Sequence, residues 1–207
     1  LINADYLLLT SVTESSSGIE ARYEIFDVRK KSKIRSSKVY GVSNNVRQLS
    51  HYVSDGIYEA ITGIKGVAST KILYVNQSNS LDLSYKLLVA DADGANEQLL
   101  VKSPEPIISP AWSPDSKKVA YVSFETGTAN VYIQDISTGD RESIIKKTCP
   151  SCSTNEQISS PSWSPDGKYL SLTLYQDGNA EIYIYNLQKR NLTRLTNHYS
   201  IDTESKW

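Results

Sequence analysis

Methionine is absent from the 207-residue sequence, and long apolar runs are absent as well. Without methionine, and without a charged-then-apolar leader, we expect a processed product or the ordered part of a longer protein. Even the longest apolar runs, such as Tyr6 to Leu9, are far too short to cross a bilayer, so we expect no membrane span.

An excess of charge of either sign is also lacking. The chain carries 22 basic and 23 acidic side chains, a formal net charge of −1, and no basic stripe stands out. Electrostatic capture of nucleic acid or of an anionic membrane is therefore not expected. The hydrophobic content of 39%, with 14 tyrosines, instead suits a β-rich protein with much exposed sheet surface.

Cysteine is scarce, because only Cys149 and Cys152 occur. We favour a disulfide that closes a tight loop, with free thiols as the second interpretation. A zinc site would need two more ligands, and the two histidines, His51 and His198, lie far off in sequence. A redox-active pair would need a helix N-terminus behind it, whereas residues 153–156 look like a loop. We expect no metal site and no cofactor.

An internal repeat is the most informative feature that is present. Residues 109–145 and 160–196 follow one plan, with a short strand that ends in tryptophan, a turn, and further strands. Trp112, Trp163 and Trp207 recur at 51 and 44 positions, and we expect them to pack between repeats. Four-stranded units of about 40–50 residues that stack radially form a β-propeller.

The turn and strand chemistry of the repeats agrees with this plan. Ser113-Pro114-Asp115-Ser116 and Ser164-Pro165-Asp166-Gly167 are turns, since proline presets φ and aspartate bonds nearby backbone. The runs between turns are β-branched, aromatic and nearly apolar throughout, which indicates strands covered on both faces. These runs are residues 119–122, 131–133, 170–174 and 182–185.

The repeat defines the domain organisation. We expect a partial propeller over residues 67–207, with blades at about 70–106, 109–147 and 160–197, and the opening strand of a fourth blade at 204–207. The first blade lacks a leading Pro-x-Trp strand of its own.

Residues 1–66 lack the tryptophan repeat, and their pattern predicts a small α+β domain. We expect strands from Asp5 to Val12, from Glu20 to Val28 and from Lys33 to Tyr40. Apolar residues then recur at helical spacing from about Asn45 to Thr62. Asn45 with Gln48 forms a capping box, and Gly63 is the expected C-cap. The predicted fold class is thus an α+β N-terminal domain followed by an all-β propeller.

Three segments resemble the TolB family. They are the hinge Ile61-Thr62-Gly63-Ile64-Lys65-Gly66, the strand that follows it from Thr70 to Val75, and the stretch from Ser103 to Phe124. The resemblance implies a six-bladed ring in the periplasm of a Gram-negative bacterium. It also implies a non-enzymatic scaffold of the Tol–Pal system that supports outer-membrane integrity and cell division. The propeller would bind the peptidoglycan-associated lipoprotein Pal, and the N-terminal region would meet TolA. Other Tol or outer-membrane proteins are further partners that the resemblance allows.

The expected partner site lies where the segments before each tryptophan strand converge on the central channel. The resemblance assigns Pal binding to these segments, and the alternative for the serines is to cap the ends of the inner strands. At 155–157 the chain has Asn-Glu-Gln where family members can show a histidine. The candidate residues are Ile108, Ser109, Ser159, Ser160, Asp202, Thr203 and Glu204.

Rival functions stay open beside this interpretation. Peptidase propellers carry similar turns, but the Gly-x-Ser-x-Gly elbow of their hydrolase domain is missing from the sequence. A carbohydrate- or metal-binding propeller is the other alternative. A homodimer of half-propellers would let Trp207 of one copy complete the blade that starts at Lys71 in another. The simpler expectation is that further blades exist outside this sequence.

Overall fold

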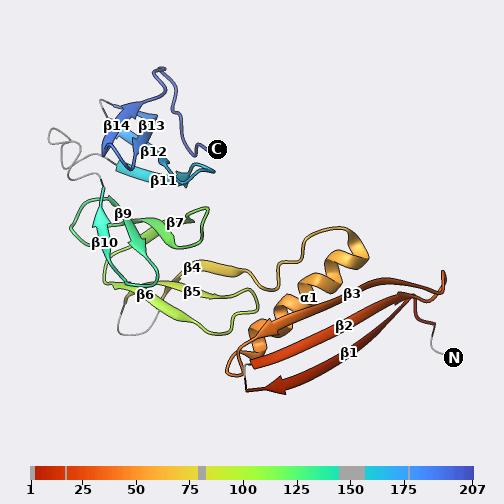
Figure 1. The fold of residues 1–207 in the computed structure, drawn as a ribbon. Coiled ribbons are helices and arrows are strands. Elements are labelled where there is room, and N and C mark those ends of the chain that lie inside the picture. Colours follow the sequence, from red (N-terminus) through yellow and green to blue (C-terminus); the bar gives the residue numbers. More distant parts are fainter. Residues whose placement is uncertain (1–2, 17, 79–82, 145–156, 177) are drawn as a thin grey trace. The chain divides into compact units, whose positions relative to one another are not determined.

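The computed structural model describes residues 3–16, 18–78, 83–144, 157–176 and 178–207 (Figure 1). Both cysteines lie outside these ranges, so the predicted disulfide stays a prediction. The chain forms two compact units. The N-terminal unit comprises Leu1–Ile72 with Ala90–Asn96, and the C-terminal unit comprises Leu73–Val89 with Glu97–Trp207. A domain boundary after residue 66 also stays a prediction.

The N-terminal unit is an antiparallel sheet covered by one helix. Strands β1 (Tyr6–Ser15), β2 (Gly18–Asp27) and β3 (Ser32–Gly41) lie in the order β1-β2-β3. Alternate residues of β2, from Ile19 to Ile25, are buried because a strand turns every second side chain to the same face. Helix α1 (Val46–Thr62) packs its buried Leu49 against this face. Within the described ranges, no helix is long and apolar enough to span a membrane.

The ends of α1 match the predicted caps. The side chain of Asn45 accepts a hydrogen bond from the backbone N–H of Gln48 at 3.2 Å, which satisfies one of the free donors of the first turn. Gly63 has φ of +74° and donates its N–H to the carbonyl of Glu59 at 2.8 Å. Since glycine adopts the left-handed region without a Cβ penalty, the helix ends there.

The segment after α1 is fixed by the carboxylate of Asp55. This group accepts hydrogen bonds from the N–H of Ala68 at 2.7 Å and from the N–H and hydroxyl of Ser69 at 2.9 and 2.5 Å. Burial alone would raise the pKa of Asp55, but these hydrogen bonds outweigh it and lower the pKa. A Cβ on Gly66 would lie 2.4 Å from the Cα of Asp55, so the approach of the two backbones requires glycine.

Three antiparallel sheets, one three-stranded and two four-stranded, make up the C-terminal unit, except that Lys71, Ile72, Ala90 and Asp91 at the ends of two strands belong to the N-terminal unit. The first contains β4 (Lys71–Gln77), β5 (Tyr85–Asp91) and β6 (Gln98–Ser103). The second contains β7 (Ile107–Trp112), β8 (Lys118–Ser123), β9 (Asn130–Asp135) and β10 (Arg141–Ser143). The third contains β11 (Gln157–Trp163), β12 (Tyr169–Gln176), β13 (Asn179–Asn186) and β14 (Asn191–Arg194). These elements confirm the predicted fold class.

The sheets pack face to face through two apolar clusters. One joins the first and second sheets and includes Leu87 and Tyr121, with Trp112 packed against it. The other joins the second and third sheets and includes Val122 and Leu172, with Trp163 packed against it. The middle strands are therefore covered on both faces, as their uninterrupted apolar runs predict. The tryptophans fill the space between successive sheets.

Each later tryptophan also donates a hydrogen bond to the preceding repeat. The indole N–H of Trp163 reaches the carbonyl of Ala111 at 3.3 Å, and that of Trp207 reaches the carbonyl of Ser162 at 3.0 Å. The two acceptors belong to β7 and β11, each of which is the last strand of its sheet. The carbonyl of Ser162 also accepts from the hydroxyl of Ser171 at 3.4 Å, so the indole adds a hydrogen bond between repeats to the bonds within the sheet.

We expected residues 204–207 to open a fourth blade. They lie where the strands that end in Trp112 and Trp163 lie in the earlier repeats, but they have no regular strand pairing. A strand is defined by a partner strand, and the contacts of this segment are individual hydrogen bonds. Glu204 donates its N–H to the hydroxyl of Thr173 at 3.3 Å, in addition to the indole bond of Trp207.

We expect the replacement Trp163→Phe to lower the free energy of unfolding by about 1–2 kcal/mol, because the indole hydrogen bond to Ala111 is lost and the cluster loses apolar area. Denaturant unfolding followed by circular dichroism measures the change. The matched control is Tyr175→Phe, an exposed aromatic of the same sheet, which should stay close to the unaltered protein. Equal stability of the Trp163 and Tyr175 variants would contradict this account of the inter-repeat bond.

We expect Asp55→Asn to destabilise the N-terminal unit in a pH-dependent manner. Because the pKa of Asp55 is lowered from the usual 3.8, its stabilising effect is fully present above that pH and is lost as the pH falls through the folded-state pKa. The stability difference between the two proteins should therefore shrink in acid, as measured by urea unfolding at a series of pH values. Glu14→Gln, on exposed β1, is the control. A difference that does not vary with pH would argue against the proposed hydrogen bonding.

Candidate functional site

The same backbone irregularity recurs in all three repeats, three residues before each tryptophan. Ser109, Ser160 and Glu204 have φ values of +52°, +54° and +55°. Left-handed backbone is uncommon for residues other than glycine and often marks functional or tightly determined positions. In the first two repeats it coincides with a bulge, since strand pairing is interrupted between Ile108 and Ala111, and between Ser159 and Ser162.

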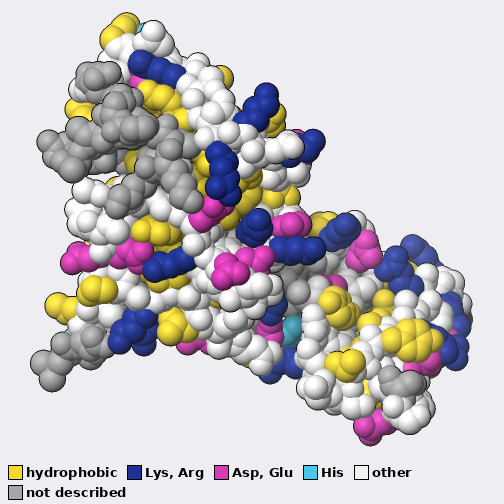
Figure 2. Space-filling view, turned by 60° about the vertical axis from the view of Figure 1, so that its left-hand side comes forward, with side chains coloured by type: hydrophobic (Ala, Val, Ile, Leu, Met, Phe, Trp, Pro, Cys, Tyr) yellow, Lys and Arg dark blue, Asp and Glu magenta, His cyan; other side chains and the backbone are white. Residues whose placement is uncertain are grey.

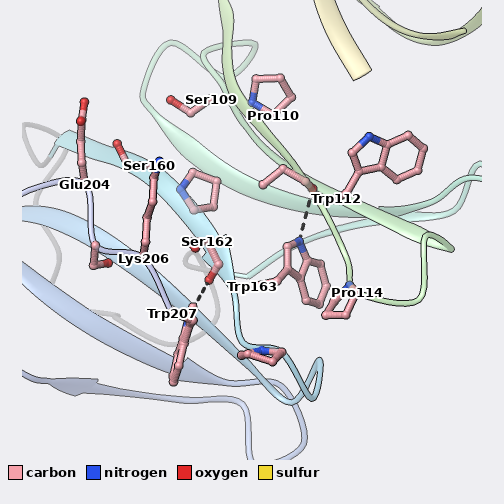
Figure 3. Close-up of a pocket in the computed structure, with 14 residues that line it drawn as sticks. Ser109, Pro110, Trp112, Pro114, Ser160, Ser162, Trp163, Glu204, Lys206 and Trp207 are labelled. Atoms are coloured by element: carbon pink, nitrogen blue, oxygen red, sulfur yellow. Dashed lines mark hydrogen bonds between the residues drawn. The ribbon is translucent and has the colours of Figure 1, made fainter. Parts of the chain in front are cut away.

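The bulges turn the chain so that a cavity opens between the repeats. Its volume is about 520 Å³, and all three repeats contribute to its wall (Figure 3). Each repeat contributes the same four positions to the wall, from the residue with left-handed backbone to the tryptophan. The lining residues that Figure 3 labels are Ser109, Pro110, Trp112, Pro114, Ser160, Ser162, Trp163, Glu204, Lys206 and Trp207.

Three of the seven residues predicted for partner binding line this cavity, namely Ser109, Ser160 and Glu204. The other four precede them in the chain and are not part of its wall. Ile108 is 40% exposed and Thr203 is exposed, while Ser159 and Asp202 are half-buried. The cavity therefore brings together one residue of each predicted segment.

Lys206 is a lining residue that the sequence analysis missed. It stands one position before Trp207, where the earlier repeats have Ala111 and Ser162. An alignment of the repeats could have indicated Lys206, because it is a charged residue at the position where the earlier repeats have a small one. Lys206 and Glu204 bring opposite charges to the segment before Trp207.

The chemistry of the wall suits hydrogen bonding to a polypeptide. Serine hydroxyls, one carboxylate and one ammonium group lie among tryptophan and proline rings, a combination that interfaces use for orientation and apolar contact. Among the described lining residues there is no histidine to activate a serine. The described ranges also contain no group of His, Cys, Asp and Glu side chains able to hold a metal ion.

Charge does not dominate the surface. Basic and acidic side chains lie next to one another on the face shown in Figure 2, in keeping with a net charge of −1. The described surface therefore offers local charged groups rather than a field of one sign.

We expect Ser160→Gly to raise the free energy of unfolding by up to about 1 kcal/mol, because glycine removes the Cβ penalty of the left-handed backbone. Ser162→Gly, two residues along the same strand with no positive φ, is the matched control and should lower it by about 0.5–1 kcal/mol. Denaturant unfolding compares the two. Equal destabilisation by both replacements would contradict the strained geometry at Ser160.

Three comparisons with known proteins agree on a family. A family model described as the TolB beta propeller domain matches residues 58–207. The Tol-Pal system protein TolB of Alcanivorax borkumensis is 43% identical over 180 residues, 86% of this chain and 40% of that protein. TolB of Xylella fastidiosa strain M12 is 44% identical over 143 residues, 68% of this chain and 33% of its own length.

A solved structure supports the same assignment. The crystal structure of TolB from Acinetobacter baumannii has a TM-score of 0.86 and 38% identity, and the match covers 98% of this chain and 49% of that one. The chain thus spans about one third to one half of the length of these three relatives. The resemblance inferred from the hinge and the repeats is confirmed, and the chain belongs to the TolB beta-propeller family.

Proposed function

We propose that this chain is part of a non-enzymatic, protein-binding scaffold of the Tol–Pal cell-envelope system, and that it acts in the periplasm. The observation that carries the proposal is the cavity to which three successive repeats contribute equivalent residues. Because the left-handed residue recurs in each repeat, one extended partner could contact equivalent residues of several repeats at once. Its relatives are named for the Tol–Pal system.

The partner proposed for the cavity is the lipoprotein Pal. Ser109 and Ser160 would exchange hydrogen bonds with its backbone or polar side chains, while Glu204 and Lys206 would pair with charges of opposite sign. The tryptophan and proline rings would supply the apolar contact that fixes an interface. This division of roles follows from the side chains that line the wall.

The N-terminal unit is proposed to contact TolA, and the assembled system to support outer-membrane integrity and cell division. These parts of the proposal rest on family membership, and the partners of the whole protein are proposals because the chain covers only part of its relatives. The homodimer of half-propellers stays a prediction from the sequence.

A scaffold is favoured over the alternative peptidase or carbohydrate-binding propellers by the composition of the wall. Acyl transfer by serine needs a base within hydrogen-bond reach of the hydroxyl, and the described cavity residues offer serines without histidine. Trp112 and Trp163 pack against the clusters between the sheets, which leaves Trp207, 52% exposed, as the one tryptophan of the described wall with an exposed ring to stack on a sugar.

The test is calorimetric titration of the protein with a soluble Pal domain that lacks its lipid anchor. Thr203→Ala combined with Glu204→Ala should weaken binding at least about tenfold, the effect of losing one hydrogen bond to a charged group. The bond from the N–H of Glu204 to Thr173 involves backbone and is kept in this variant. A loss of affinity would therefore come from the missing side chains and not from a change in the backbone conformation of this segment.

Lys189→Ala, in the exposed turn between β13 and β14, is the matched control and should bind like the unaltered protein. Tight binding that the paired replacement does not change would reject the cavity as the Pal site while keeping Pal as the partner. Absence of binding by the unaltered protein would reject Pal as the partner.

A further inference from the structure

The segment that leads from β14 to the cavity is held by β13 of the same sheet. We call residues 195–204 the crossover segment, since it joins the outer strand of the third repeat to the residues that line the cavity. Regular strand pairing does not extend into it. Its path therefore depends on individual hydrogen bonds, and these converge on Glu181 and its neighbours.

Glu181 is the centre of this arrangement, and its side chain is 1% exposed. One carboxylate oxygen accepts from the guanidinium of Arg194 at 2.8 Å, from the backbone N–H of His198 at 2.9 Å and from the side-chain amide of Asn179 at 3.2 Å. The other oxygen accepts from the hydroxyl of Thr196 at 2.5 Å. A buried carboxylate is tolerated only with such a full set of donors.

Neighbouring groups of β13 extend the attachment along the crossover segment. The side-chain amide of Asn179 also donates to the carbonyls of His198 at 2.5 Å and Ser200 at 3.1 Å. The N–H of Asp202 donates to the carbonyl of Ala180 at 2.9 Å. The attachment thus reaches the residue that directly precedes Thr203.

The blade fold itself does not require an acid at this position. Strand register places Asn186 opposite Tyr169 and Asp135 opposite Lys118, so Asn130 of the preceding repeat corresponds to Glu181. Among described residues, the side chain of Asn130 bonds within its own hairpin, to residues 126 and 128. The carboxylate is therefore a feature of the third repeat.

We propose that Glu181 is a positioning residue for partner binding, which fixes the crossover segment so that Glu204, next to Thr203, is held in the cavity wall. The inference rests on the proposed function of that cavity. Glu181 does not line the cavity, so its effect on a partner would be indirect. A segment ordered before binding loses less conformational entropy on association, which favours affinity.

The electrostatics agree with this role. The hydroxyl of Thr196 and the N–H of His198 lower the pKa of Glu181 against the opposing effect of burial, and Arg194 adds to the lowering, so that the pKa falls to about 2. The carboxylate therefore stays charged throughout the physiological pH range, and both of its oxygens can accept hydrogen bonds.

The decisive variant is Glu181→Gln, which keeps the size of the side chain but replaces an accepting oxygen by a donating amide. Hydrogen exchange should show the amides of His198, Asp202 and Glu204 exchanging about tenfold faster or more, as expected when a hydrogen bond to a charged group is lost. The affinity for the soluble Pal domain should fall about tenfold in parallel. Asn179→Ala, a milder change at the rim of the same cluster, should produce a smaller effect on both measurements.

Asn186→Ala is the matched control, because it removes two side-chain hydrogen bonds, from the N–H groups of Gln188 and Lys189, at the opposite end of β13. It should leave exchange in the crossover segment and Pal affinity unchanged. Unchanged exchange in Glu181→Gln would overturn the inference, as would faster exchange with unaltered affinity. Failure of the unaltered protein to bind Pal would instead overturn the proposed function, and the exchange experiment would still decide whether Glu181 holds the crossover segment.

Discussion

The contact between each tryptophan and the preceding sheet is the interaction on which the rest of the C-terminal unit depends. A four-stranded blade has two apolar faces and cannot bury them alone, so successive blades must meet at a fixed spacing. Trp163 meets this need twice. Its ring packs against the cluster between the second and third sheets, and its indole N–H donates to the carbonyl of Ala111 in the preceding sheet. Apolar area and a specific hydrogen bond thus act at the same place.

This contact also creates the candidate site. The tryptophan is held against the preceding sheet. The chain that arrives from the previous sheet must therefore change direction within the few residues before the tryptophan. The left-handed backbone of Ser109, Ser160 and Glu204 is the turn that accomplishes this, and the three residues line one cavity. A structural requirement of the repeat therefore yields a row of equivalent, partly exposed polar positions. Binding surfaces on repeat proteins commonly arise in this way.

Much of the fold could be predicted because it depends on local chemistry. The capping of α1 by Asn45 and Gly63 follows from residue types at fixed spacing, and the Ser-Pro-Asp turns follow from proline and aspartate. The register of the tryptophans gave the repeat. Such features need no knowledge of distant parts of the chain.

Other features could not be predicted because they depend on contacts between distant residues. Nothing in Ser-Pro or Glu-Ser indicates a left-handed backbone, so the geometry at Ser160 and Glu204 emerges only from the structure. The convergence of donors on Glu181 likewise requires that residues 194–198 fold back onto β13. In the candidate site, the predicted segments were placed near the cavity, while the contribution of Lys206 became apparent from the assembled wall.

The most direct test of the central claim, that the three-repeat cavity receives the partner, is site-specific photo-crosslinking. A photoreactive amino acid placed at position 109, 160 or 204 should crosslink to the soluble Pal domain, because all three positions line one cavity. The same group at position 189, in the exposed turn outside the cavity wall, should not. Crosslinking from position 189 with none from the cavity positions would contradict the account.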